Sequence, residues 1–529
     1  MEQAVLEEIL SRVRMGEAKS IGELNKIKLD VSRRFRLPSM PKNSEIIAVA
    51  SENDRQQFRH VLTRKPARSM SGVTVVAVMT KPMGCVGKCI YCPESLVPGK
   101  KTPKSYTGLE PSTMRSMMFN FDPFRVIRNR LQQYCEINKE AQKIELVLQG
   151  GTFCALPYAH QKYFIKRCFE GILNQKTATL ANAKTLAEKS VTRVVGITIE
   201  TRPDWCRKKD INRMLGFGTT RVELGVQHAD DEIYLKTARG HTVQDVVEAT
   251  QLLKDSCLKV LYHVMPGLPG SNPGKDLKNF RMLFEKQEFK PDMVKIYPCL
   301  VIPNTPLYNL WKQGKFAPYS SEEAARLIAE MKQFVPRHVR IMRIQRDIPS
   351  QLIAGGVKKS NLRELVEKEL TEKGMACKCI RCREAALKSY KKGMIISAEN
   401  AGLLRCDYTA SNGKEVFLSI EDRKNDALFG FCRLRLPFSP FRKEITTDTA
   451  LIRELHVYSP VLELGQRDAR AIQHRGFGKQ LMLEAERIAR EELGCKKIVV
   501  ISGIGVREYY QRFFGYESDG CYVSKEIAK

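Results

Sequence analysis

Apolar residues follow two different periods along the chain, and each period predicts one kind of element. Residues 1–13, MEQAVLEEILSRV, carry apolar side chains at helical spacing, which predicts a helix. From Val73 onward, short apolar runs alternate with helical segments such as the one around Tyr163 to Leu173. The runs cover residues 73–79, 144–151, 193–201, 221–227, 259–267 and 293–298. Strands that alternate with helices indicate parallel βαβ units, so this region is predicted to form a barrel or partial barrel with functional residues at the carboxyl ends of its strands.

A second pattern begins at about Gly402, where strands dominate. The runs GKEVFLSIED, ALFGFCRLRL and TALIRELHVYS precede a glycine-bearing turn, a helix, a last strand and a short aromatic segment. This order predicts a smaller, mixed α/β domain. We therefore divide the chain into a basic helical extension (1–72), a barrel domain (73–373), a cysteine-rich linker (374–401) and a C-terminal domain (402–529).

Charge adds a partner to this picture. Lys and Arg number 88 against 59 acidic residues, a formal net charge of +29, which favours nucleic acid as a partner. Basic residues gather in the extension at Lys19, Lys26, Lys28, Arg33, Arg34, Arg36, Arg64, Lys65 and Arg68. They form either a solvated helical face with a linker or an RNA contact. No apolar run of about 18 residues and no secretory signal is present, which predicts a cytoplasmic protein without membrane attachment.

Six of the 16 cysteines lie in two clusters, which indicates metal ligation in a reducing compartment. Cys85, Cys89 and Cys92 follow a predicted strand, and three thiolates at this spacing can hold three irons of a 4Fe–4S cluster and leave the fourth iron open. A structural zinc site usually has four protein ligands, which makes it the less favoured interpretation here. The second cluster is predicted to bind zinc rather than to remain free thiols, with His338 or water as fourth ligand; its members are Cys377, Cys379 and Cys382.

Several polar and glycine positions follow predicted strands. Gly150, Gly151 and Thr152 form a turn where an amino-acid ligand can approach the backbone closely. Glu200 ends a strand, where it either contacts a ligand or pairs with Arg202. A further set lies on other predicted strands: Gln227, Lys295, Tyr297, Glu454, Leu455, His456 and Val457. Lys295 either serves a cofactor site or neutralises a buried carboxylate, and Glu454 and His456 are either candidate bases or a buried pair.

A glycine-bearing loop before a predicted helix indicates an anion site in the C-terminal domain. The loop consists of Gln473, His474, Arg475, Gly476, Phe477 and Gly478. Glycines let successive N–H groups converge on a pyrophosphate at a helix N-terminus. Tyr509 or Tyr510 in the following aromatic segment is a candidate general acid for a departing thiolate, unless both are packing aromatics.

The ordered blocks CIYCP, SYTGLEPSTMR, QGGTF, ITIETRPDWC, HVMPGLPGS, VKIYP, RELHVY and QHRGFG resemble the Elongator catalytic-subunit family over most of residues 73–529. The resemblance implies a radical S-adenosylmethionine (SAM) partial (β/α) barrel followed by a mixed α/β GNAT acetyltransferase domain. Two departures stand out. Only three residues separate Cys85 from Cys89, and the spacing between the tyrosine pair and Gly515 is one residue longer than usual, which leaves open which tyrosine acts.

The family resemblance also implies cofactors and residue roles. It implies a 4Fe–4S cluster, SAM and acetyl-CoA as co-substrate, with zinc in some members. It places Gly150, Gly151, Thr152, Glu200 and Gln227 at the radical SAM site, Lys295 and Tyr297 near the SAM or the acetyl-CoA site, and the 455–457 strand and 473–478 loop at acetyl-CoA. Catalytic roles fall to Tyr509, Tyr510, Lys295 and Glu454.

The implied activity is addition of a carboxymethyl group to C5 of the wobble uridine in a tRNA anticodon stem-loop. The alternatives are a protein lysine acetyltransferase with a structural iron–sulfur domain, and a non-catalytic tRNA-binding scaffold. The basic chain fits a polyanion better than a basic histone tail. Whether the protein forms a homodimer or binds Elongator-like partner subunits is left open.

Overall fold

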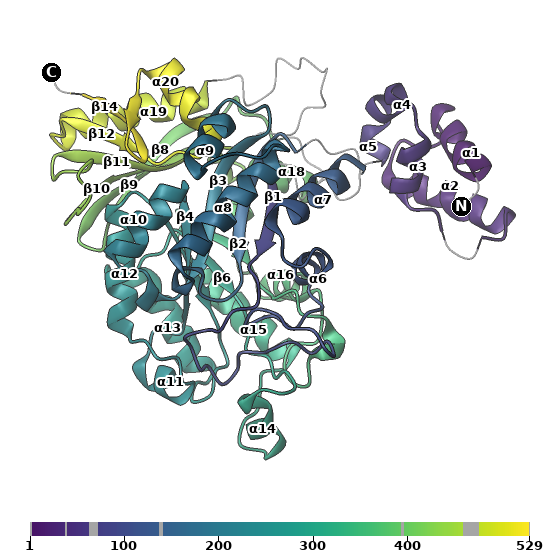
Figure 1. Cartoon of the computed structure of the whole chain (residues 1–529), viewed down its shortest axis with the longest axis horizontal. Helices are drawn as coiled ribbons and strands as arrows, with labels where there is room; N and C mark the ends of the chain where they lie inside the picture. The colour runs from purple at the N-terminus through teal and green to yellow at the C-terminus, as the bar shows by residue number, and fades with distance from the viewer. Residues whose placement is uncertain are drawn as a thin grey trace.

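The computed structural model describes residues 3–37, 40–62, 72–136, 141–392, 396–458 and 476–527. Three parts follow one another along the chain, and Figure 1 shows a group of N-terminal helices beside two larger α/β parts. None of the described helices combines the length and the apolar character that crossing a membrane requires.

The N-terminal part is a small helical bundle with a core of its own. Its helices are α1 (Gln3–Arg14), α2 (Ile21–Arg34), α3 (Asn43–Val49), α4 (Glu52–Gln57) and α5 (Arg59–Leu62). Ile9, Leu10 and Val31 are fully buried in that core. The predicted helix is confirmed, and packing of apolar faces holds the bundle together. Arg64, Lys65 and Arg68 lie outside the described residues.

The middle part is an open parallel sheet of seven strands in sequential order, which confirms the predicted partial barrel. Its strands are β1 (Thr74–Met79), β2 (Lys143–Gln149), β3 (Arg193–Thr201), β4 (Arg221–Gln227), β5 (Lys259–Val264), β6 (Met293–Ile296) and β7 (Arg340–Arg343). The sequence analysis missed β7 because RIMR is short and half polar. β1 and β7 have no mutual pairing in the described sheet, so the barrel does not close.

Helices between the strands surround the sheet (Figure 1). The main ones are α7 (Pro123–Glu136), α8 (Tyr158–Leu173), α9 (Leu180–Glu188), α10 (Lys208–Phe217), α12 (Val243–Asp255), α13 (Pro273–Glu285) and α15 (Ser321–Met331). Shorter helices include α6 (Pro111–Met118), α11 (Asp231–Lys236) and α14 (Pro306–Lys312), and α16 (Leu362–Glu372) follows the last strand. Because the strands are covered, most of their residues are buried, and β4 is buried at all its positions.

The C-terminal part contains a mixed sheet, which confirms the predicted mixed α/β domain. The strand order in this sheet is β13-β14-β12-β11-β10-β9-β8. Its strands are β8 (Ala401–Ala410), β9 (Gly413–Asp422), β10 (Ala427–Leu436), β11 (Thr449–Val457), β12 (Lys497–Val500), β13 (Glu517–Asp519) and β14 (Tyr522–Glu526). The helices are α17 (Ile380–Arg383), α18 (Ala385–Lys392), α19 (Phe477–Arg487) and α20 (Arg507–Phe514). β11 pairs with β12 in parallel only from Thr449 to Ile452, and continues beside β10 to Val457.

The two sheets share one hydrophobic core and a buried ionic cluster. Leu451, Val499 and Tyr522 of the C-terminal sheet belong to the same core as the barrel strands. The interdomain cluster, as we call it, contains three charged residues of the barrel part and four of the C-terminal part: Lys254, Asp255, Asp292, Glu415, Arg433, Arg435 and Arg453. All seven side chains are at most 1% exposed. The packing of one part on the other is therefore an internal interface and not a loose tether.

Candidate active site

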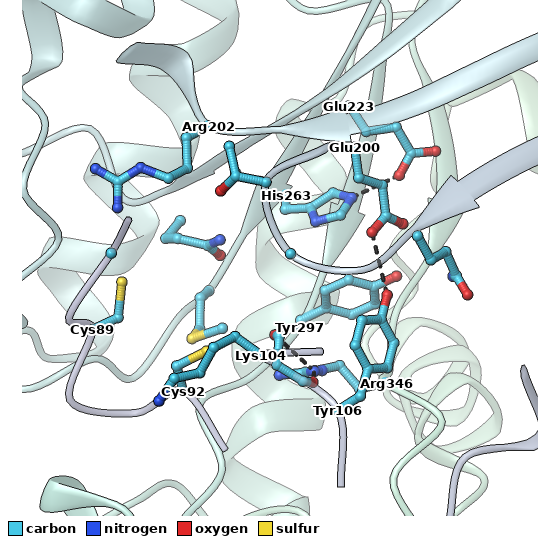
Figure 2. A pocket seen from close by; sticks show the side chains of 18 of the residues that line it. Cys89, Cys92, Lys104, Tyr106, Glu200, Arg202, Glu223, His263, Tyr297 and Arg346 are labelled. Carbon is cyan, nitrogen blue, oxygen red and sulfur yellow. Dashed lines mark hydrogen bonds and ion pairs between the residues drawn. The ribbon is translucent and has the colours of Figure 1, made fainter. Parts of the chain in front are cut away.

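A cavity of about 170 Å³ opens at the carboxyl ends of the barrel strands, where functional residues were expected. The loop after β1 brings Cys85, Cys89 and Cys92 to its wall. Residues at the ends of the other strands complete it, among them Gly151, Thr152, Glu200, Gln227, Lys295 and Tyr297. Gly150 lies just behind this wall. Figure 2 shows Cys89 and Cys92 on one side of this cavity and Glu200 and Glu223 on the other.

The three cysteines of the loop are free thiols, each half-buried. Arg239 Nη1 donates to Cys89 Sγ at 3.3 Å, and the backbone N–H of Gly87 donates to Cys85 Sγ at 3.4 Å. These donors hold two of the three sulfur atoms in place at the cavity wall. Glu110 holds the following segment by accepting from Thr107 and other groups, with its carboxylate only 4% exposed.

The turn after β2 depends on glycine for two reasons. Gly150 has φ +125°, and a Cβ at this position would lie 2.1 Å from Thr80 Oγ1. No other residue type fits both the conformation and the close approach. Gln227, at the end of β4, has a left-handed φ of +67° without being glycine, and its side chain faces the cavity. Backbone strain of this kind gathers at ligand sites.

Glu223 Oε1 forms no hydrogen bond but lies 3.7 Å from Arg221, and four further polar side chains at the cavity wall have buried atoms without a hydrogen-bond partner in the described structure. The atoms are Tyr91 Oη, Gln149 Oε1, Arg202 Nη1 and Gln227 Oε1. An unsatisfied buried polar atom costs about 1–3 kcal/mol, so four at one cavity indicate partners that a ligand supplies. Three thiols, a glycine turn and these polar atoms fit an iron–sulfur cluster with an amino-acid ligand at its open iron.

A buried charge network occupies the opposite wall of the cavity. Lys295 Nζ pairs with Glu223 and lies 3.8 Å from Glu200, and His263 Nε2 lies 2.7 Å from Glu223 Oε2. Burial alone would lower the pKa of Lys295, but the Glu223 carboxylate raises it above its usual value. Burial would raise the pKa of Glu223, whereas Lys295 and then His263 hold it far below its usual range. The lysine is therefore charged, and the prediction that it neutralises a buried carboxylate is confirmed.

Other contacts of this network rule out the expected pairing of Glu200 with Arg202, and they add Glu223 and His263 to the site. Arg202 pairs with Asp204 at 2.9 Å and not with Glu200, whose partner is the Tyr106 hydroxyl at 3.3 Å. Glu223 and His263 were not among the predicted site residues. A glutamate inside the apolar run RVELGVQ was the available signal, since a buried acid requires a partner.

The candidate anion site of the C-terminal domain lies where β11 leaves β12. Beyond Ile452 the described ladder to β12 ends, so Leu455, His456 and Val457 pair with β10 alone. Gly476 caps α19 in the left-handed conformation with φ +73°. Phe477 packs in the core and Gly478 lies in the first turn. Gln473, His474 and Arg475 lie outside the described residues.

The two tyrosines of α20 occupy different environments. A Cβ at Gly478 would lie 3.1 Å from Tyr509 Oη, so this hydroxyl reaches the start of α19. Tyr509 is half-buried, and burial raises the pKa of its phenol. Tyr510 is 5% exposed and packs in the core of the C-terminal sheet. Of the two tyrosines, Tyr509 is therefore the one whose hydroxyl lies beside the first turn of α19.

Glu454 and His456 point to a structural pairing more than to a base. Glu454 accepts from Arg433 Nε at 2.9 Å; burial would raise its pKa, but Arg433 lowers it below the usual value. Burial lowers the pKa of His456, whose ring lies 4.3 Å from that of Tyr458. Of the two interpretations of Glu454, buried pairing is the one that the contacts favour.

The second cysteine cluster brings its three sulfur atoms within 4.8 Å of one another, as a metal site requires; they belong to Cys377, Cys379 and Cys382. Among the residues with described positions, this ligand group contains no histidine. The ring of His338 instead stacks on Tyr408 at 4.0 Å, so His338 is not the fourth ligand.

Comparisons with known proteins agree with this architecture. Residues 80–281 match the Radical SAM superfamily, 291–372 its C-terminal domain, 381–516 the Acetyltransferase (GNAT) family and 2–70 the ELP3 N-terminal domain. The chain is thus a radical SAM protein that carries an acetyltransferase domain. The radical SAM match implies a 4Fe–4S cluster and SAM, and the acetyltransferase match implies acetyl-CoA.

Full-length relatives define the family within this class. A tRNA uridine(34) acetyltransferase of Methanocaldococcus infernus is 50% identical over 99% of both chains. Elongator complex protein 3 of Drosophila melanogaster is 41% identical over 97% of this chain and 94% of its own. The solved structure of Methanocaldococcus infernus Elp3 with an N-terminal deletion superposes with a TM-score of 0.77 at 49% identity, covering 86% of this chain and all of that one. The chain belongs to the family of tRNA uridine(34) acetyltransferases and Elongator complex protein 3.

Proposed function

We propose that this chain is a tRNA-modifying enzyme that uses SAM and acetyl-CoA to place a carboxymethyl group on C5 of the wobble uridine. One observation carries the proposal. The barrel part has a cavity with three free thiols and four buried polar atoms that lack a hydrogen-bond partner among the described residues. This part shares a continuous hydrophobic core with the C-terminal part, in which the first turn of α19, at Gly478, faces the Tyr509 hydroxyl.

Cys85, Cys89 and Cys92 would hold the cluster, and the turn at Gly151 and Thr152 would hold the methionyl group of SAM. When bound, these groups supply one-electron, hydrogen-abstracting chemistry, and acetyl-CoA supplies the two-carbon unit. The part of the chain is to orient the reactants and to exclude water. Arg202 and Gln227 have free buried polar atoms that are available to a bound ligand.

Lys295 is suited to hold a proton in the cavity. It is the cation between two acids, since its amine contacts both Glu223 and Glu200. His263 shares the Glu223 carboxylate with Lys295, and the protonated lysine can donate a hydrogen bond or a proton to a substrate in the cavity. Glu200, Glu223 and His263 also lie close enough together to hold a metal ion, but the Lys295 ammonium already contacts both acids.

Tyr509 is the proposed general acid that protonates the departing CoA thiolate, with the start of α19 holding the pyrophosphate. The neighbouring Tyr510 packs in the core, and we assign it no chemical role. Backbone groups of residues 455–457, which have no β12 partner in the described ladder, are free to pair with the pantetheine arm.

The N-terminal bundle is the proposed tRNA contact, together with the anticodon stem-loop site at the cavity. Lys26, Arg33 and Arg36 on or after α2 are exposed, and Phe35 beside them is 41% exposed. Cations interleaved with an aromatic ring suit a phosphate backbone and a stacked base. Lys28, by contrast, is buried and donates to Asn43 at 2.8 Å, so it belongs to the bundle.

Zinc is the proposed occupant of the Cys377, Cys379 and Cys382 cluster, with water or another small ligand in the fourth position. The cluster lies beside β7, since the N–H of Ile380 donates to Val339 O at 2.9 Å. Its proposed role is to fix the linker between the two sheets.

The test is acetyl-CoA hydrolysis by the full-length protein, with and without total tRNA. Strong stimulation by tRNA supports the uridine activity. Hydrolysis that ignores tRNA and rises with lysine peptides contradicts it and favours a protein acetyltransferase. Formation of 5′-deoxyadenosine after anaerobic cluster reconstitution separates an enzyme from a scaffold with a structural cluster.

A further inference from the structure

A second cavity, of about 330 Å³, lies apart from the one that holds the three N-terminal cysteines. Its wall is formed by the short turn after α15, by α16, by α17 and by the start of α18. The N–H of Ile380 in α17 bonds to Val339, immediately before β7, whereas Arg343 at the other end of β7 lines the radical SAM cavity. The two cavities therefore lie at opposite ends of the same edge strand. We call the second one the linker cavity.

Three cations line the linker cavity without a partner among the residues that the structure describes. Lys332 is 1% exposed, and its ammonium forms no hydrogen bond with any of these residues. Arg363 on α16 and Arg381 on α17 are half-buried and form no hydrogen bond or ion pair with any residue that the structure describes. Lys388 also lines the cavity, but its ammonium already donates to the carbonyl of Asp426 at 3.0 Å.

The charges at this wall do not balance. Glu367 is the one carboxylate among the described lining residues. If zinc occupies the cysteine cluster, three thiolates around a divalent ion contribute one further negative charge. Three free cations then still exceed two negative charges, and without the metal the excess is larger. A buried ammonium without a partner costs several kcal/mol, so this arrangement favours binding of an anion.

We propose that the linker cavity is a binding site for a phosphate-type oxyanion. Two guanidinium groups present planar, paired donors that match phosphate oxygens, and the Lys332 ammonium adds a point charge at the base of the cavity. The volume lies in the range of small-ligand sites and exceeds the needs of one phosphate group. The phosphate belongs either to an RNA backbone or to a free phosphorylated molecule, and one set of experiments separates the two.

The variant R363Q/R381Q removes the positive charge at two of these positions and leaves a shorter, neutral polar side chain at each. Lys368→Gln is the matched control, because Lys368 lies on the same helix with its side chain 70% exposed and outside the cavity wall. Lys332→Met repeats the measurement at the buried amine. Each full-length protein is checked for its unfolding midpoint and its zinc content before binding is measured.

Two measurements are made on each protein. The first is calorimetric titration with pyrophosphate in phosphate-free buffer, and the second is the salt dependence of the Kd for total tRNA. Pyrophosphate binding that falls at least tenfold in R363Q/R381Q but not in Lys368→Gln identifies a free phosphorylated ligand. Absence of pyrophosphate binding, with a slope of log Kd against log salt that falls by about 0.7–0.9 per lost contact, identifies an RNA phosphate.

The proposal is overturned if the parent protein binds no pyrophosphate and the salt slopes of R363Q/R381Q, Lys332→Met and Lys368→Gln are equal. It is also overturned if the cavity variants and the control lose pyrophosphate affinity alike, because the binding would then be a general effect of net charge. Neither result bears on tRNA-stimulated acetyl-CoA hydrolysis, which tests the proposed function separately.

Discussion

The interdomain cluster and the radical SAM cavity both bury charged and polar groups, but they differ in how these groups are paired. Two guanidinium nitrogens of the cluster, Arg433 Nη1 and Arg453 Nε, form no hydrogen bond with the described residues. Each of the four cations of the cluster has a carboxylate within ion-pair distance, as Arg453 has at 2.6 Å from Asp292. In the cavity, Arg202 and Gln227 keep buried polar atoms that have no partner in the described structure. Paired buried charges hold two domains together, whereas unpaired ones mark a place for a ligand. Burial alone does not distinguish a structural charge from a ligand-binding one, but the presence of an oppositely charged partner does.

The largest expected effect comes from replacing the cluster ligands. C85A/C89A/C92A should abolish formation of 5′-deoxyadenosine and the binding of iron, because no thiolate remains. The unfolding midpoint of the metal-free protein should change little, since these thiols are half-buried in a loop. Cys135→Ala is the control, as Cys135 is exposed on α7, and it should retain activity. Normal iron content in the triple variant would contradict the site.

Breaking the interdomain cluster should act on stability instead. Asp292→Asn removes the charge that faces Arg453, Arg433 and Lys254, which should cost about 3–5 kcal/mol of unfolding free energy in urea. Asp448→Asn is the matched control, because its 3.3 Å pair with Lys496 is exposed and should contribute little to stability. Equal costs for the two variants would show that the cluster is not an essential contact.

The two tyrosines of α20 apply the same comparison within the C-terminal domain. Tyr509→Phe should lower tRNA-stimulated acetyl-CoA hydrolysis by about 10²-fold with little loss of stability, because it removes a general acid. Tyr510→Phe should leave hydrolysis within a few-fold of the parent, since Tyr510 packs in the core. The opposite order of rates would move the chemical role to Tyr510.

A smaller effect, on the pH dependence of stability, is expected at His338. Burial, and then Arg433, lowers the pKa of His338 from 6.5 to about 3. Between these values the unfolded chain binds a proton that the folded chain does not, so stability falls as pH drops below 6.5. At pH 5 the loss should be about 2 kcal/mol relative to pH 7.5. His338→Phe keeps the stacking on Tyr408 and should remove this part of the pH dependence of urea unfolding; an unchanged dependence would show that His338 is protonated in the fold.

Most of the fold could be predicted from the sequence because its elements are long and periodic. Polar or glycine residues lie in or at the ends of the predicted barrel strands, and they located one wall of the cavity, including Glu200 and Lys295. The short strand β7 carries no such pattern, and its place at the sheet edge depends on contacts with β6. Its register, and with it the position of Arg343, could not be obtained from local sequence.

Only those site residues that belong to a local sequence motif could be predicted. Spacing within one loop located Cys85, Cys89 and Cys92, but the partner of a charged residue lies on another strand. Glu223 and His263 form a hydrogen bond although they lie 40 residues apart in the sequence. Arg202 pairs with Asp204 and not with Glu200. The choice between Tyr509 and Tyr510 likewise depends on packing, because two adjacent residues of a helix face different neighbours.

The shared core and the interdomain cluster also limit how this protein can be dissected. A C-terminal domain expressed by itself would present Arg433, Arg435 and Arg453 to water without Asp255 and Asp292, together with an apolar sheet face. Such a fragment is expected to aggregate, and an activity measured on it would describe a damaged surface. Proteins of this architecture are best studied with both halves in one polypeptide, and natural splitting of the gene between β7 and β9 would require the two products to fold together.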